Sequence, residues 1–159
     1  TVVLQERLDQ AAAAGPAALL AVWREGLAAI ATVHAHGQHL SQAFDRNLVQ
    51  CPDGVIGYID FEDDPSEVMT LAECQARDWL SYLHSTAMML EAAAPDAAGQ
   101  HWHAALADVN ADVRERIANA ARRMKWAQKL PASRRWGRDT QRVRAVARLL
   151  GRWHLPPAR

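Results

Sequence analysis

The sequence has few of the features that mark a membrane-spanning, secreted or disulfide-stabilised protein. No apolar run reaches the ~20 residues that a transmembrane helix needs, because Arg24 and Glu25 interrupt the longest one. The first residues lack the basic start and the apolar stretch of a signal peptide. Cys51 and Cys74 are the only cysteines, too few for a disulfide framework. These absences predict a cytoplasmic protein with two free thiols and no transmembrane segment.

Basic residues are scarce in the first two thirds of the chain, although the 159 residues have a net charge of zero. Residues 1–112 contain four Arg, no Lys and 16 Asp and Glu, whereas residues 113–159 contain 14 Lys and Arg and two acids. Two interpretations fit this asymmetry. The basic end either packs against and balances the acidic body, or it forms a surface for phosphate groups of lipid, nucleotide or nucleic acid.

Apolar residues are plentiful enough for one domain with a core, since they make up 50% of the chain. Residues 1–14 begin with a β-branched stretch that predicts a strand remnant or hinge. A helix should follow from Pro16, which suits a first helical turn, to Gly37, which suits a C-terminal stop. Two short strands, over 47–49 and 55–59, should form a hairpin around a Pro-Asp-Gly turn.

The second half of the sequence predicts three helices. Thr70 and Glu73 have the spacing of a capping box, and this helix should run to about Ala94. Asp96 could cap the next helix, whose apolar stripe extends to Met124. The last helix should begin near Asp139. The predicted fold class is therefore mainly α (α+β), with helices around one short β-hairpin.

Residues 33–62 contain a spaced set of residues that resembles a known motif. Val33-His34 is followed by the helix-ending Gly37, then by Asn47 at the start of a strand, and thirteen residues later by Asp60-Phe61-Glu62. The segment is similar to the C-terminal lobe of protein-kinase-like phosphotransferases. It is closer to the bacterial lipopolysaccharide kinases and aminoglycoside phosphotransferases than to eukaryotic protein kinases, and it also resembles a group of putative bacterial serine/threonine kinases. The resemblance covers roughly residues 1–94.

The resemblance implies a role for several residues. Asn47 and Asp60 would be the metal ligands that hold the Mg²⁺ of a bound ATP, because amide and carboxylate oxygens suit that ion. Gln42 occupies the catalytic position where the family has its Asp base, and an amide cannot accept the proton of an attacking hydroxyl. Asp78 would anchor the catalytic loop through the loop backbone.

Two other residues of the same loop, His39 and Asp45, are alternative bases. The nucleotide-clamping lysine of such folds lies on an N-terminal lobe, and the first lysine here is Lys125. Because the chain also begins without Met, we expect this N-terminal lobe, the implied partner, to lie upstream. The expected organisation is a hinge over 1–14, a kinase-like C-terminal lobe over 15–130, and a basic C-terminal helix over 131–159 packed on that lobe.

Three functions remain open at this point. The first is a nucleotide- and Mg²⁺-binding phosphotransferase of unknown acceptor, an ATP-dependent kinase if active. The second is a non-catalytic pseudokinase that acts as a binding or regulatory module. The third is a basic helical binder of nucleic acid or of an anionic membrane, which would place the protein in the cytoplasm or at the periphery of the inner membrane.

Other signals predict structure more than chemistry. The histidines have no zinc-ligand spacing, and the serines have no nucleophile-elbow context. Trp23, Trp79 and Trp102 recur on apolar helix faces and should be core residues. The remaining tryptophans, Trp126, Trp136 and Trp153, lie among Arg and Lys residues. That mixture is typical of a membrane-interface or nucleic-acid surface, and also of a helix with one buried side.

Overall fold

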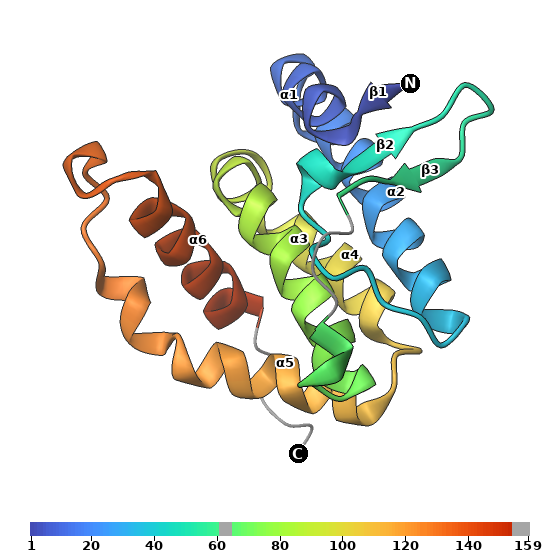
Figure 1. Cartoon of the computed structure of the whole chain (residues 1–159). Coiled ribbons are helices and arrows are strands. Elements are labelled where there is room, and N and C mark those ends of the chain that lie inside the picture. The colour runs from blue at the N-terminus through green and yellow to red at the C-terminus, as the bar shows by residue number, and fades with distance from the viewer. Residues whose placement is uncertain (61–64, 154–159) are drawn as a thin grey trace.

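The structure is a computed structural model that describes residues 1–60 and 65–153. Within these ranges it has six α-helices and three short β-strands (Figure 1). The helices are α1 (Leu4–Ala14), α2 (Pro16–Ala35), α3 (Leu71–Ala93), α4 (Pro95–Leu106), α5 (Ala111–Arg123) and α6 (Arg138–Trp153). The strands are β1 (Val2–Val3), β2 (Leu48–Gln50) and β3 (Ile56–Tyr58). Single 3₁₀ turns are η1 (Asp45–Asn47), η2 (Pro65–Glu67) and η4 (Arg134–Trp136), and η3 (Lys125–Lys129) is longer. The chain is mainly α with a small sheet, as the sequence predicts.

The three strands form one antiparallel sheet in the order β1-β2-β3. β2 and β3 are the predicted hairpin, in which Leu48 pairs with Tyr58. Gly54 in the connecting turn has a φ of 84°, a left-handed conformation that favours glycine. β1 pairs with the other edge of β2, where Val3 lies opposite Val49. The sheet therefore has one strand more than the hairpin alone.

The strand predicted at the start of the chain stops at Val3, and the rest of the segment 1–14 forms α1. Leu4 and Leu8 are one helical turn apart and are both fully buried. Burial of this pair favours helix over the extended conformation that the preceding valines suggest. Gly15 ends α1 with a φ of 130°, and Pro16 then starts α2 in a new direction.

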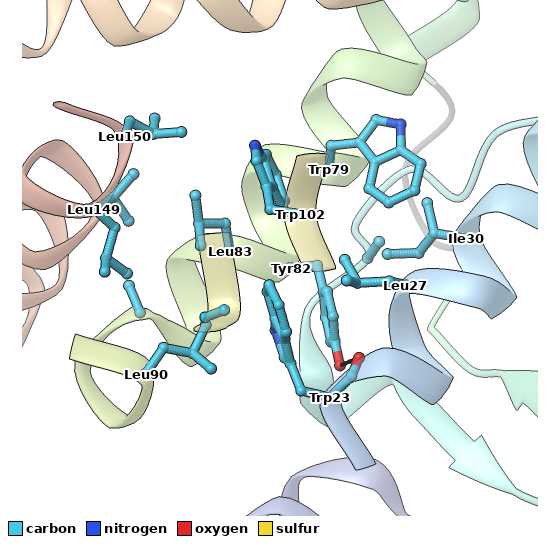
Figure 2. Close-up of a cluster of buried hydrophobic side chains, with 14 of the residues drawn as sticks. Trp23, Leu27, Ile30, Trp79, Tyr82, Leu83, Leu90, Trp102, Leu149 and Leu150 are labelled. Carbon is cyan, nitrogen blue, oxygen red and sulfur yellow. Dashed lines mark hydrogen bonds between the residues drawn. The ribbon is translucent and has the colours of Figure 1, made fainter. Parts of the chain in front are cut away.

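Helix α3 runs through the centre of the molecule and contacts α2, α4, α5 and α6. The capping box predicted at its start is confirmed: Glu73 N donates to Thr70 Oγ1 at 3.2 Å, and Thr70 N donates to Glu73 Oε2 at 2.9 Å. Figure 2 shows the core that gathers around this helix, with Tyr82 stacked on Trp23 of α2. The Trp23 indole donates to Thr86 Oγ1 at 3.1 Å, so its buried N–H is satisfied.

The single helix predicted from Asp96 to Met124 is wrong, because the structure has two helices there. α4 ends at Leu106, and α5 begins after Asn110, whose side chain accepts a hydrogen bond from Asp112 N at 2.8 Å. No Gly or Pro marks this break, and Asn110 caps α5 although the apolar spacing continues across it. The predicted stripe is nevertheless buried along both helices: Trp102, Leu106, Val113 and Ile117.

Helix α6 packs along α3 and completes the core. Leu149 and Leu150 face Leu83 and Leu90 in Figure 2. Trp153 is 5% exposed, and its indole donates to Pro95 O at 2.6 Å. Of the two interpretations left open for Trp126, Trp136 and Trp153, a helix with one buried side is therefore the one that applies to Trp153. Trp23, Trp79 and Trp102 are buried as predicted.

Helix α2 is the one helix of the described ranges that is long and apolar enough to cross a membrane by length and composition alone. Core helices meet the same test, and its Trp23, Leu27 and Ile30 face is buried in the core. Arg24 is exposed on the opposite side. We therefore describe α2 as a core helix. Cys51 and Cys74 form no disulfide with each other.

Candidate functional site

The candidate site is built around the segment that joins α2 to the sheet, residues 36–44, which we call loop 36–44. Gly37 has a φ of 71° and ends α2, as predicted from the sequence. The loop then crosses the flank of α3 and enters η1 and β2. Ser41, in the middle of the loop, has a φ of 48°, which is uncommon for a residue other than glycine.

Asp78 of α3 holds the centre of this loop. Its carboxylate is fully buried, and Oδ2 accepts a hydrogen bond from Leu40 N at 2.7 Å. The same oxygen lies 2.8 Å from His34 Nε2, at the end of α2. The His34 ring in turn meets the Trp79 ring edge-on at 5.5 Å. One buried carboxylate thus joins the end of α2 to the loop backbone, which is the contact that the resemblance implies for Asp78.

Gln75 gives the loop a second attachment, which the sequence analysis missed. It lies one turn before Asp78 on α3, is 8% exposed, and donates through Nε2 to Gln38 O at 3.0 Å. A third contact comes from Ser85, whose hydroxyl accepts from Asp45 N at 3.1 Å. The only sequence signal for these residues is their helical spacing with Asp78, since glutamine and serine are common on any helix.

The hairpin brings the two implied metal ligands to one end of the sheet. Because Leu48 pairs with Tyr58, the preceding residue Asn47 lies opposite Ile59, and Ile59 N donates to Asn47 O at 2.9 Å. Asp60 follows immediately and is exposed, with a left-handed φ of 69°. The sheet register therefore places Asn47 beside the strand end that carries Asp60. Phe61 and Glu62, the rest of the motif, lie outside the described residues.

Asn47 also links the hairpin to loop 36–44. It is 5% exposed, and its Nδ2 donates to Gln42 O at 3.0 Å. This bond uses the amide nitrogen of Asn47 as donor. Gln42 itself is half-buried, and its N–H meets Leu40 O. The structure therefore brings Gln42, Asn47 and the hairpin end together.

The donor set at this end of the sheet fits magnesium. One amide and one carboxylate oxygen leave most positions of an octahedral ion for water and phosphate, which is how proteins commonly hold Mg²⁺ with a nucleotide. The described part of the chain contains no group of three or more His, Cys, Asp or Glu side chains that could hold a metal. A set of two such ligands suits an ion that arrives with its phosphate ligands.

Of the two alternative bases, Asp45 is the more unusual residue. It is 4% exposed at the start of η1, and burial raises the pKa of its carboxyl, an effect that hydrogen bonds from Arg46 N and Ser85 partly offset. His39 is half-buried and accepts from Ser41 N through Nδ1 at 3.3 Å. A carboxylate with a raised pKa is closer to what a general base needs near neutral pH.

Asp45→Asn is expected to stabilise the fold at neutral pH, because it removes a desolvated charge. The folded-state pKa of Asp45 lies above its unfolded value, so the native state binds more protons between the two. The wild type should therefore lose stability relative to the variant as pH rises through this interval. Urea denaturation at several pH values from acidic to neutral measures the difference. A variant that is less stable at neutral pH would show that the carboxylate is stabilising.

A cavity of about 720 Å³ opens next to loop 36–44, between α3 and α5. Phe44 at the loop end forms one wall, and Met69 and Leu80 add apolar surface. Arg77 and Arg123 also line it, together with the ion pair of Arg116 and Glu73. The volume lies in the range of small-molecule sites.

A comparison of the chain with protein-family models, with curated proteins and with solved structures finds no match.

Proposed function

We propose that the chain is the nucleotide-facing lobe of a kinase-like protein, in which Asn47 and Asp60 bind the Mg²⁺ of a nucleotide. The observation that carries the proposal is the connected set from α3 to the hairpin. Asp78 fixes Leu40, and the Gln42 carbonyl fixes the Asn47 amide. The sheet register then sets Asn47 opposite Ile59, the residue before Asp60. When bound, the ion would neutralise charge on the phosphates.

A second function shares this site. Gln42 stands where the resemblance expects an Asp base, so a non-catalytic pseudokinase that binds nucleotide as a regulatory module is the alternative. Asp45 is only 4% exposed, which leaves its carboxylate little access to the hydroxyl of an acceptor. A measurement of ADP release from ATP, with a panel of hydroxyl acceptors, distinguishes the two functions. Turnover supports the phosphotransferase, and nucleotide binding without turnover supports the pseudokinase.

Nucleotide binding is tested by thermal unfolding of the full-length protein with ATP, with and without Mg²⁺. A ligand present at 100 times its Kd stabilises the native state by about 2.7 kcal/mol. For a protein of this size or somewhat larger, that is an increase in Tm of roughly 5–10 °C. Asp60→Asn should abolish the part of the increase that depends on Mg²⁺, while the protein still folds, because Asn also tolerates a left-handed backbone.

Asp53→Asn is the matched control, since it makes the same change in the turn of the same hairpin. Asp53 Oδ1 accepts from Val55 N at 3.1 Å, a bond that an Asn oxygen retains. We expect the control to keep the full response to Mg²⁺ and ATP. No increase in Tm at millimolar ATP and Mg²⁺ would exclude nucleotide binding. An unchanged Mg²⁺ response in Asp60→Asn would mean that the metal lies elsewhere.

A further inference from the structure

The basic residues of the C-terminal third fall into two groups in the structure. Five arginines of α5 and α6 form ion pairs with acidic residues: Arg116 with Glu73 and Asp112, Arg122 with Glu115, Arg142 with Asp139, Arg148 with Glu91, and Arg152 with Asp96. Three of these acids, Glu73, Glu91 and Asp96, belong to α3 and α4. The helices therefore follow the first interpretation of the charge asymmetry, in which the basic end balances an acidic body.

The segment between these helices differs. Residues 123–138, which we call the basic connector, contain no acidic residue, and their six cations are all exposed. These cations are Arg123, Lys125, Lys129, Arg134, Arg135 and Arg138. None of them forms an ion pair with any residue in the described ranges. The second interpretation, a surface for anionic groups, therefore applies to the connector.

Two tryptophans stand on the same segment. Trp126 is 66% exposed and Trp136 is 63% exposed, whereas the other four are at most 5% exposed. The neighbouring Ala127 is fully buried, so η3 is fixed to the body by one side while the Trp126 ring is directed outward. Figure 1 shows the connector along the outer edge of the molecule, between α5 and α6. The connector therefore combines two exposed indoles with exposed cations that form no ion pair in the described ranges.

We propose that the basic connector docks on an anionic membrane surface. Exposed cations are attracted by acidic lipid headgroups, and Trp rings prefer the boundary between headgroups and acyl chains. The combination of a polybasic stretch and interfacial aromatic side chains is what peripheral binding requires.

A single-stranded nucleic acid fits the connector less well. Such ligands need a basic groove with aromatic platforms for successive bases. Trp126 and Trp136 lie on separate short helices, ten residues apart in the chain. The segments η3 and η4 therefore present one exposed indole each, rather than adjacent stacking platforms on one element.

Co-sedimentation with vesicles tests the proposal on the full-length protein. Vesicles of phosphatidylcholine with a quarter phosphatidylglycerol should bind it, and vesicles of phosphatidylcholine alone should not. The double variant Arg134→Gln/Arg135→Gln should lower the partition constant about 25-fold, since each basic residue near an anionic surface contributes about five-fold. Trp126→Ala/Trp136→Ala should lower it roughly ten-fold and remove the fluorescence quenching caused by brominated acyl chains.

Arg148→Gln/Arg152→Gln is the matched control, because it removes the same charge from two arginines that are already paired. We expect a change in partition below three-fold and an unchanged response to salt, whereas wild-type binding should weaken as salt rises. Equal losses in this control and in the connector variant would overturn the proposal, because net charge alone would then explain binding. Absence of vesicle binding would also overturn it, and binding of oligo-dT instead would assign the connector to nucleic acid.

Discussion

Replacement of Asp78 by alanine should cost about 3–5 kcal/mol of folding free energy, the range for removing one partner of a buried ionic or hydrogen-bonded pair. The carboxylate is fully buried, and the change leaves the Leu40 N–H and the His34 ring without their acceptor. Loop 36–44 would lose its central attachment to α3. Urea denaturation followed by circular dichroism measures the loss, and the midpoint should fall with little change in the slope.

Two further variants make this result specific. Asp78→Asn keeps an oxygen for Leu40 N and should lose clearly less stability than the alanine variant. Asp108→Ala removes an exposed carboxylate and should change stability by no more than about 0.5 kcal/mol. If Asp78→Ala lost as little stability as Asp108→Ala, the buried carboxylate would not anchor loop 36–44. The proposal that α3 holds this loop in place would then be wrong.

Gly26→Ala should be the second strongly destabilising change. A methyl group at Gly26 would overlap the hydroxyl and ring of Tyr82. Tyr82 cannot yield, because it is fully buried, stacked on Trp23 and hydrogen-bonded to Trp23 O at 3.0 Å. Overpacking of this kind costs about 1–3 kcal/mol or more, which exceeds the ~1 kcal/mol that alanine gains in a helix. Thermal unfolding should show a decrease in Tm of several degrees.

Gly151→Ala is the counterpart within α6. There the added methyl group meets the amide end of the Gln128 side chain, which is flexible and can move. The gain in helix propensity should then prevail, and Tm should stay the same or rise. A similar decrease in both variants would indicate that the two glycines are needed for backbone conformation. Overlap with Tyr82 would then not be the cause of the lower Tm of Gly26→Ala.

The sequence predicted those elements whose signals are local. The capping box at Thr70, the hairpin turn at Gly54 and the stop at Gly37 each depend on residues next to one another in the chain, and all three are present. The break at Asn110 was missed because apolar spacing continues across it. The sequence did not predict α1, because the β-branched Val2 and Val3 favour a strand at the start of the chain. The helix is stabilised by burial of Leu4 and Leu8 in the core.

The candidate site was predictable only in part, for the same reason. Asn47 and Asp60 lie toward the same end of a short hairpin, so their spacing in the sequence already indicates that they are near each other in the fold. Gln75 and the partners of Asp78 depend on how α3 lies against loop 36–44, which no local pattern contains. The division between paired arginines and the basic connector likewise depends on where Glu91 and Asp96 lie in the fold.

The two left-handed residues of the site have a consequence for protein design. Ser41 and Asp60 are the only residues other than glycine with positive φ in the described ranges, and both lie in or beside loop 36–44 and the hairpin end. Glycine suits either backbone better, so a redesign that optimises stability alone would choose it at both positions. Such a protein would keep its helices and core while discarding the Asp60 carboxylate. Stability-optimised sequences for this backbone are therefore the ones in which the proposed metal site disappears first.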